Sequence, residues 1–262
     1  MNMKNRGNEK KNNRGQITIF IIIAILIIAA GVLIYLFYPK IIPGGESAAK
    51  NPQAFMQSCL EEAINQKIDV LSLKGGSISP EHYFVYKGDT IEYLCYTNEY
   101  YKTCAMQQPM LKNHIEAEIK NSIKKDVEKC FEDLQSSFEK RGYEVNLKSG
   151  ETKVELLPKR IVVNFGHELT LTKESSEKYN SIRILLNNNL YELVSIANSI
   201  LNMEARYGDA ETTIYMNYYK DLKVEKYKQT DGTTIYILTD RNNGKKFQFA
   251  SRSISWPPGY GV

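Results

Sequence analysis

Residues 17–38 read ITIFIIIAILIIAAGVLIYLFY, a run of 22 residues without a charged side chain. As an α-helix, such a run is roughly 30 Å long, which matches the hydrocarbon thickness of a bilayer. Tyr35 and Tyr38 fall at its C-terminal end, where tyrosine favours the headgroup layer. The run therefore predicts one transmembrane helix. It is expected to be retained rather than cleaved, because its apolar core is longer than that of a secretory signal.

The charge of the chain lies on one side of this run. Residues 1–16 form a tail with one acidic and five basic residues, a net charge of +4 that equals the net charge of the whole protein. Only Lys40 follows closely after the run. By the positive-inside rule the tail is cytoplasmic, and the chain from about residue 40 onward is extracytoplasmic. The rest of the protein is electrically neutral, which argues against nucleic acid as a partner.

A linker rich in proline and glycine, residues 39–50, separates the membrane segment from the ectodomain. Asn51-Pro52 then marks the start of a first helix, and Lys74-Gly75-Gly76 marks its end. The expected apolar face of this helix consists of Phe55, Cys59, Ala63 or Ile64, Ile68 and Leu71.

Two more helices are expected from apolar residues at three- and four-residue spacing. One runs continuously from Ile115 to Phe138, and the other covers about 176–203. Segments with period-two patterns or turn residues between them predict strands at 82–86, 91–96, 143–147, 153–157, 160–165, 212–219, 222–229, 233–239 and 246–251.

These patterns predict an α+β fold: a disulfide-stapled ectodomain of helices and antiparallel strands after the transmembrane helix. Residues 51–142 are expected to be mainly helical. Residues 143–262 are expected to be rich in sheet, with one helix at about 176–203. The sequence leaves open whether these two parts form one domain or two lobes.

All four cysteines follow the predicted membrane span: Cys59, Cys95, Cys104 and Cys130. An even number on the extracytoplasmic side indicates two disulfides, with three possible pairings. Cys59 and Cys130 lie on or beside helical apolar faces, and Cys95 and Cys104 flank a short loop, so we favour the pairs 59–130 and 95–104. Zinc is disfavoured, because closely spaced pairs of ligands are missing.

The sequence gives no positive sign of catalysis, and we expect a protein that is not an enzyme and needs no metal or cofactor. His114 and Glu118 are one helical turn apart, but their surroundings indicate a solvated helix face. His167-Glu168 is interpreted as a turn. A nucleophile elbow, a P-loop and a dinucleotide-binding glycine motif are absent from the sequence.

Eighteen tyrosines are the most distinctive compositional feature of the chain. Packing in the core or sheet is the preferred interpretation, and a binding face is the alternative. The candidate binding aromatics are Tyr93, Tyr96, Tyr100, Tyr101 and Trp256. Trp256 begins the C-terminal segment WPPGYGV, which either docks on the domain or engages a partner.

The segment Arg14-Gly15-Gln16-Ile17 resembles the class III signal of archaeal type IV pilin-like proteins. The resemblance implies cleavage between Gly15 and Gln16 by a prepilin-type peptidase, with the apolar helix left in place. Pilins usually carry a glutamate at the fifth mature position, where it helps to register subunits in the filament. This chain has Phe20 there.

Most of residues 14–145 resemble a group of uncharacterised membrane-anchored proteins of small-genome archaea. The shared features are the basic-Gly-Gln start, Cys59-Leu60-Glu61, the extended segment from Gly75 to Pro80, Cys130 late in a long helix, and Gly142-Tyr143-Glu144-Val145. Cys95 and Cys104 are not part of that pattern, and their absence from it favours the pair 59–130. The resemblance implies no activity.

Together these features predict a single-pass membrane-anchored extracytoplasmic protein with a structural or binding role in the cell envelope. Its expected partners are the lipid bilayer and, through the apolar helix, other envelope proteins or further copies of itself. The alternative is a pilin-like subunit processed after Gly15 and assembled through that helix. An envelope hydrolase is the third hypothesis, which the missing motifs disfavour.

Overall fold

The computed structural model describes residues 22–28 and 51–255. The chain divides into two units, Met1–Gly45 and Glu46–Val262. In the first unit, residues 22–28 are helical and their side chains are exposed. Among the described residues, no helix combines the length and the apolar character needed to cross a membrane. The rest of the 17–38 run, the tail with Gly15 and Gln16, the linker, and Trp256 lie outside the described residues.

The second unit begins with the predicted first helix, α2 (Pro52–Leu73). The side chain of Asn51 accepts a hydrogen bond of 2.9 Å from the backbone N–H of Gln53, and Pro52 occupies the first helical position. Its buried face is rotated slightly from the predicted one, since Met56 and Leu60 are fully buried whereas Cys59 is only partly buried.

A six-stranded mixed sheet contains both the first and the last strands of the ectodomain. Its main path runs β1-β2-β12-β11-β10, with β3 paired to β2. All its ladders are antiparallel except that between β12 and β2, which is parallel. The strands are β1 (Tyr83–Tyr86), β2 (Asp89–Tyr96), β3 (Ala105–Met106), β10 (Leu222–Lys228), β11 (Thr233–Asp240) and β12 (Lys246–Arg252). Because this sheet joins both parts of the sequence, residues 51–142 and 143–262 do not form separate lobes.

The other described strands form two antiparallel three-stranded sheets, with the strand orders β4-β7-β8 and β5-β6-β9. Their strands are β4 (Glu144–Lys148), β5 (Thr152–Leu157), β6 (Arg160–Phe165), β7 (Glu168–Thr172), β8 (Ser176–Tyr179) and β9 (Ile182–Asn187). The observed α+β class with mostly antiparallel sheets is therefore the predicted one.

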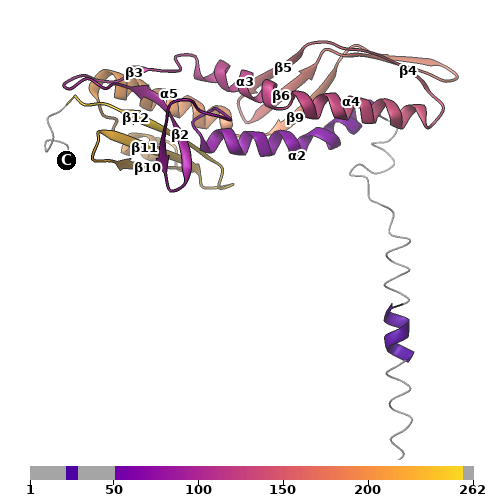
Figure 1. Cartoon of the computed structure of the whole chain (residues 1–262), viewed down its shortest axis with the longest axis horizontal. Helices are drawn as coiled ribbons and strands as arrows, with labels where there is room; N and C mark the ends of the chain where they lie inside the picture. The colour runs from indigo at the N-terminus through magenta and orange to yellow at the C-terminus, as the bar shows by residue number, and fades with distance from the viewer. Residues whose placement is uncertain (1–21, 29–50, 256–262) are drawn as a thin grey trace, which may run out of the picture. The chain divides into compact units, whose positions relative to one another are not determined.

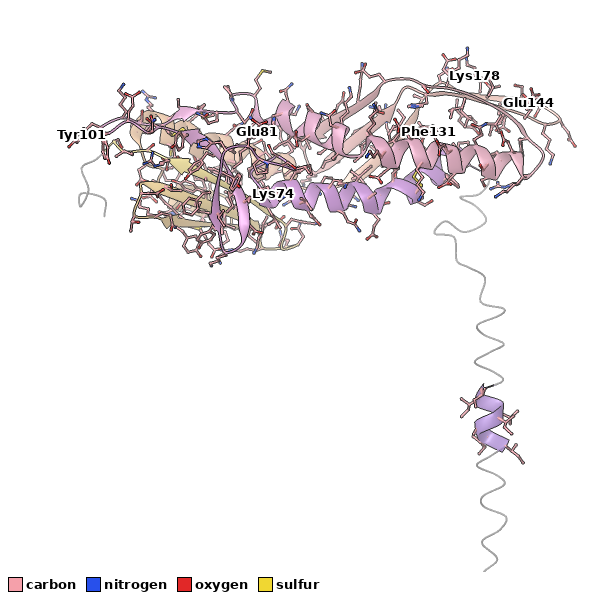
Figure 2. All side chains as sticks on the ribbon, in the orientation of Figure 1. Lys74, Glu81, Tyr101, Phe131, Glu144 and Lys178 are labelled. Atoms are coloured by element: carbon pink, nitrogen blue, oxygen red, sulfur yellow. A yellow bond between two sulfur atoms is a disulfide. The ribbon has the colours of Figure 1, made fainter. Side chains whose placement is uncertain are left out.

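The remaining helices are α3 (Leu111–Ser122), α4 (Lys124–Glu139), α5 (Leu190–Tyr207) and α6 (Thr213–Tyr218). Helix α5 packs against β11, β12 and β2 of the six-stranded sheet, whereas α2 contacts both β12 and β9 (Figure 1). One continuous hydrophobic core spans these contacts. In Figure 2, Tyr101 lies near one end of this unit and Glu144 near the other.

The predicted helix at about 176–203 is wrong in its first half. Residues of β9 alternate, with Ile182, Ile184 and Leu186 buried and the residues between them exposed. The same apolar residues also fit a helical spacing, which produced the error. Asn188 and Asn189 separate β9 from α5.

Three smaller predictions also differ from the structure. The predicted strand 212–219 contains α6, because Tyr215 turns into the core while Ile214 and Tyr218 stay exposed. The continuous helix 115–138 is interrupted at Ile123, between α3 and α4. Glu168, expected in a turn, is the first residue of β7.

Both predicted disulfides are confirmed. Cys59 on α2 is bonded to Cys130 on α4, with their Cα atoms 6.1 Å apart. Cys95 on β2 is bonded to Cys104, with Cα atoms 5.3 Å apart, and this bond closes the loop before β3. In the described part of the chain every cysteine is paired.

Candidate functional site

A cavity of about 670 Å³ lies beside the first turns of α5. Five separate segments contribute to it: the β5–β6 turn, the start of α5, α6 with the residue after it, the start of β10, and the β11–β12 turn. Its lining residues are Lys159, Asn189, Tyr191, Glu192, Leu193, Ser195, Ile196, Ser199, Tyr215, Tyr219, Asp221, Leu222, Asp240 and Asn242.

Apolar and aromatic side chains form part of the cavity wall. Leu193 and Leu222 are buried, so they belong to the core as well as to the cavity. Tyr215 is also buried, and its hydroxyl lies 2.7 Å from Ser199 Oγ. Tyr219 is 48% exposed and therefore presents its ring to solvent at the cavity. A wall of this kind suits a ligand with apolar or cationic surface.

Three carboxylates line the same cavity. Asp240 is held in place, because its Oδ2 accepts a hydrogen bond of 2.6 Å from Asn189 Nδ2 and its Oδ1 accepts one of 2.8 Å from the backbone of Asn242. Glu192 Oε1 accepts a hydrogen bond of 2.8 Å from the backbone N–H of Lys159. The Asp221 side chain is exposed and has no polar partner among the described residues.

Two buried oxygen atoms at the start of α5 also accept no hydrogen bond from the described residues. These are Glu192 Oε2 and Asn189 Oδ1. Buried acceptors of this kind are costly when unsatisfied. Four further buried polar atoms without a partner lie elsewhere in the described structure, so these two do not by themselves mark a site.

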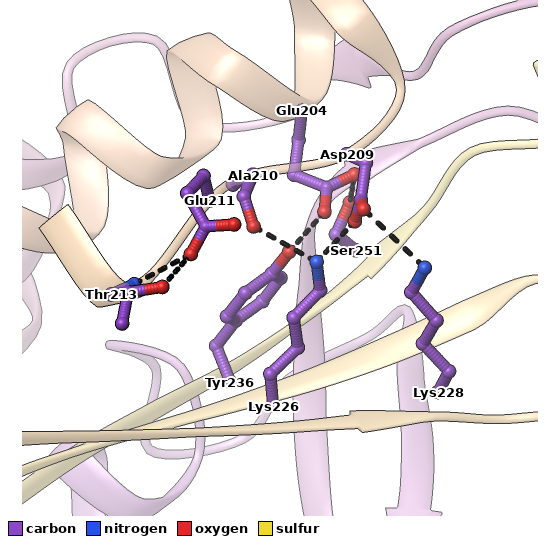
Figure 3. A network of polar contacts seen from close by, with 9 residues as sticks. All are labelled: Glu204, Asp209, Ala210, Glu211, Thr213, Lys226, Lys228, Tyr236 and Ser251. Atoms are coloured by element: carbon purple, nitrogen blue, oxygen red, sulfur yellow. Dashed lines mark hydrogen bonds and ion pairs between the residues drawn. The ribbon is translucent and has the colours of Figure 1, made fainter. Parts of the chain in front are cut away.

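A buried polar network joins α5 to the six-stranded sheet, separately from the cavity (Figure 3). Glu204 is 1% exposed and accepts hydrogen bonds from the hydroxyls of Tyr236 and Ser251. Burial raises the pKa of Glu204 despite these two hydrogen bonds. Burial, together with the adjacent carboxyl, also raises the pKa of Tyr236. Beside them, the Lys226 ammonium pairs with Asp209 and donates to the backbone oxygen of Ala210.

A second polar network corrects the interpretation of His114 as a solvated residue. Its Nε2 lies 2.8 Å from Ser77 Oγ, and Ser77 donates a hydrogen bond to the Glu92 carboxylate. Ser77 and Glu92 are both buried, and burial is the main cause that raises the pKa of Glu92. Glu118 accepts a hydrogen bond of 2.9 Å from the backbone of Ile78. These contacts fasten the segment after α2 to α3.

The four described members of the predicted binding aromatics form two pairs: Tyr93 and Tyr96 contact each other, with ring centroids 5.0 Å apart, whereas Tyr100 and Tyr101 are exposed. Tyr93 is 6% exposed, its hydroxyl lies 2.8 Å from Thr233 Oγ1, and its ring packs on His82. Tyr96 is partly buried and also contacts His82. Tyr100 and Tyr101 are both exposed, in the loop that the 95–104 disulfide closes. They do not line the cavity.

The remaining histidines likewise belong to packing. His167 stacks on Phe131, with ring centroids 4.2 Å apart, and burial lowers its pKa. Over the described ranges, no three His, Cys, Asp or Glu side chains are grouped so that they could hold a metal ion.

The residues around the cavity were not selected from the sequence as a site. Asn189-Leu190-Tyr191-Glu192 has the spacing of a helical N-cap followed by glutamate at the third position, which would have indicated where α5 begins. No comparable local signal marks Asp221 or Asp240, because the fold alone brings them to the same cavity.

Comparison with known proteins finds no match, whether to a family model, to a curated protein or to a solved structure. The geometry of the cavity therefore carries the functional argument by itself.

Proposed function

We propose that this protein is a single-pass membrane-anchored binding protein of the cell envelope, whose ectodomain lies outside the membrane and holds a ligand in the cavity beside α5. The anchor is supported by the uncharged run 17–38, and its orientation by the basic tail 1–16. The two disulfides support the same side of the membrane, since such bonds persist in oxidising compartments.

The observation that carries the binding role is the cavity itself. Its volume of about 670 Å³ lies within the range typical of sites for small ligands, and it combines buried leucines with tyrosines and a few convergent polar groups. Its two serine hydroxyls are already hydrogen-bonded, Ser195 to the backbone oxygen of Tyr191 and Ser199 to Tyr215. No histidine or cysteine is among its described lining residues. This set of groups suits binding better than nucleophilic catalysis.

A thermal-shift screen of the full chain in detergent micelles against a library of small molecules tests this proposal. Tyr219→Ala removes an exposed ring of the cavity, and Tyr100→Ala removes an exposed ring elsewhere as a matched control. We expect ligands whose stabilising shift is lost in Tyr219→Ala and kept in Tyr100→Ala. Stabilising shifts that are lost only in Tyr100→Ala would indicate that the ligand binds at the 97–104 loop, and they would contradict the proposal.

The orientation is tested separately by adding protease to intact cells. We expect digestion of the ectodomain from outside while the tail 1–16 is protected. An ectodomain that resists digestion until the cells are lysed would overturn the proposed topology.

A pilin-like subunit is the second candidate function, favoured by the Arg14-Gly15-Gln16 signal. Mass spectrometry of the native N-terminus distinguishes the two, because a pilin-like subunit begins at Gln16 and is recovered in sheared filaments. An unprocessed N-terminus without filaments favours the anchored binding protein.

A further inference from the structure

The ionisable groups that line the cavity are mostly acidic. Glu192, Asp221 and Asp240 face a single lysine, Lys159, so the lining carries two more negative than positive groups. The ectodomain as a whole is neutral, which makes this excess a local property of the cavity and not a general property of the surface. Concentrated negative charge in a partly apolar cavity attracts cations.

The carboxylates of the cavity are also poorly neutralised by the protein. In the described structure, none of the three takes part in an ion pair within 4.0 Å, including with Lys159. Asp240 is oriented by two neutral donors, and Asp221 has no partner. Elsewhere in the fold, by contrast, Asp209 is paired with two lysines. The three carboxylates of the cavity therefore keep their negative charge without a cationic partner from the described residues.

The cavity offers donors as well as acceptors: Lys159 and the hydroxyls of Tyr191 and Tyr219 can donate, whereas the carboxylates can only accept. Glu192 Oε2 and Asn189 Oδ1 accept no hydrogen bond from the described residues but are buried, whereas the Asp221 carboxylate is exposed and has no partner among those residues. A ligand that engages the Asp221 carboxylate must bring N–H or O–H donors.

The N-terminus of α5 has the opposite tendency, because a helix N-terminus favours anions. Two side chains already compensate this helix end. Asn188 Oδ1 accepts a hydrogen bond from the backbone N–H of Leu190, and Glu192 places a negative charge in the first turn. The helix end is therefore compensated within the chain, and the remaining carboxylates set the sign of the site.

We propose that the cavity binds a cationic amine, with the Asp221, Asp240 and Glu192 carboxylates accepting its N–H donors and Tyr219 lying against its alkyl or cationic part. This inference rests on the proposed role of the cavity as a binding site. A free polyamine and the lysine side chain of a basic peptide carry the same chemistry, and the test below distinguishes these two sources.

Isothermal titration of the full chain in non-ionic micelles provides the test, with spermidine, capped hexalysine and a neutral trisaccharide as probes. The decisive variant is Asp221→Asn, since its carboxylate is exposed and has no partner among the described residues, and we expect its replacement to leave the fold intact. Glu144→Gln is the matched control: it removes the same charge from an exposed position on β4, a strand that does not line the cavity.

We expect an amine to bind, with affinity at least about tenfold lower in Asp221→Asn and unchanged within about twofold in Glu144→Gln. Tighter binding of spermidine identifies a free polyamine as the ligand, and tighter binding of hexalysine identifies a protein side chain. Equal losses in both variants, or no amine binding, would overturn the inference. Binding of the trisaccharide alone, lost in Tyr219→Ala, would also overturn it while leaving the proposed binding function in place.

Discussion

Cys59 on α2 and Cys130 on α4 are covalently joined across a sequence separation of 71 residues, and the loop that they close contains α3 and the whole of the second disulfide. The Cys95–Cys104 bond spans only nine residues. In the chain-entropy model, the longer loop restricts the unfolded chain more strongly than the shorter one.

The two disulfides should therefore contribute unequally to stability. The paired substitution Cys59→Ala/Cys130→Ala is expected to lower the free energy of unfolding by about 4 kcal/mol, and Cys95→Ala/Cys104→Ala by about 3 kcal/mol. Guanidinium unfolding of the full chain measures both values. A larger loss from the nine-residue loop would show that local strain or packing, not loop closure, governs the contribution.

Glu204 should make the ectodomain less stable as the pH rises. Its pKa in the folded state is raised above the ordinary value of 4.5, mainly by burial, so the folded protein keeps a proton that the unfolded chain releases. The stability that this group provides is complete below pH 4.5 and declines as the pH rises through the folded pKa.

Glu204→Gln removes that titration and keeps an acceptor for Tyr236 and Ser251. Unfolding free energies measured between pH 4 and pH 8 should fall less steeply in Glu204→Gln than in the wild type. Glu92, whose pKa is also raised by burial, contributes in the same direction and should leave part of the slope in the variant. Identical slopes in the two proteins would contradict the assignment.

The Ser77 hydroxyl should contribute measurably to the stability of the fold. Ser77→Ala removes the hydroxyl that links the buried Glu92 carboxylate to His114, and it leaves Glu92 without that donor. We expect a loss of roughly 1–3 kcal/mol in the free energy of unfolding.

Ser122→Ala is the matched control for this change, because the hydroxyl of Ser122 bonds only to the backbone oxygen of Ile119 within α3. Its expected loss is below about 1 kcal/mol. Similar losses from the two serines in chemical unfolding would mean that the Ser77 network adds nothing.

Alanine substitutions at Gly75 and Gly88 distinguish the cost of backbone strain from the cost of a steric clash. Both have a positive φ, +88° at Gly75 and +95° at Gly88, so alanine is strained at either position by roughly 1–2 kcal/mol. A Cβ at Gly75 would lie 2.7 Å from Glu92 Cβ, whereas a Cβ at Gly88 would meet nothing within 4 Å.

Gly75→Ala should therefore lower the melting temperature clearly more than Gly88→Ala. Differential scanning calorimetry of the two variants gives the comparison. Equal shifts would indicate that the segment after α2 relaxes away from β2 at little cost.

Much of the fold could be predicted from local patterns. The Asn51-Pro52 start and Gly75-Gly76 end of α2 depend on residues close in sequence, and the cysteine pairs followed from their places on helices and a loop. The failures came where one pattern fits two structures. Ile182, Leu186 and Leu190 suit a helix by spacing, but pairing with β6 selects the strand β9.

The cavity could not be predicted in this way, because its residues come from five segments between Lys159 and Asn242. Asp221 and Asp240 are near each other only because β10 pairs with β11 in antiparallel register. Tyr215 and Tyr219 were expected on a strand. Tyr215 instead lies in α6, with its hydroxyl next to Ser199 of α5, and Tyr219 directly follows α6.

The redox state of the four cysteines in living cells tests the central claim most directly, since it reports both the fold and the compartment. Cells are lysed under denaturing conditions in the presence of an alkylating agent, which modifies any free thiol. The mass of the intact protein is then measured by mass spectrometry, both directly and after reduction followed by a second alkylation. An extracytoplasmic, disulfide-bonded ectodomain predicts no alkylation before reduction and four modifications after it. Cysteines that are alkylated without reductant would place the domain in a reducing compartment and contradict the account.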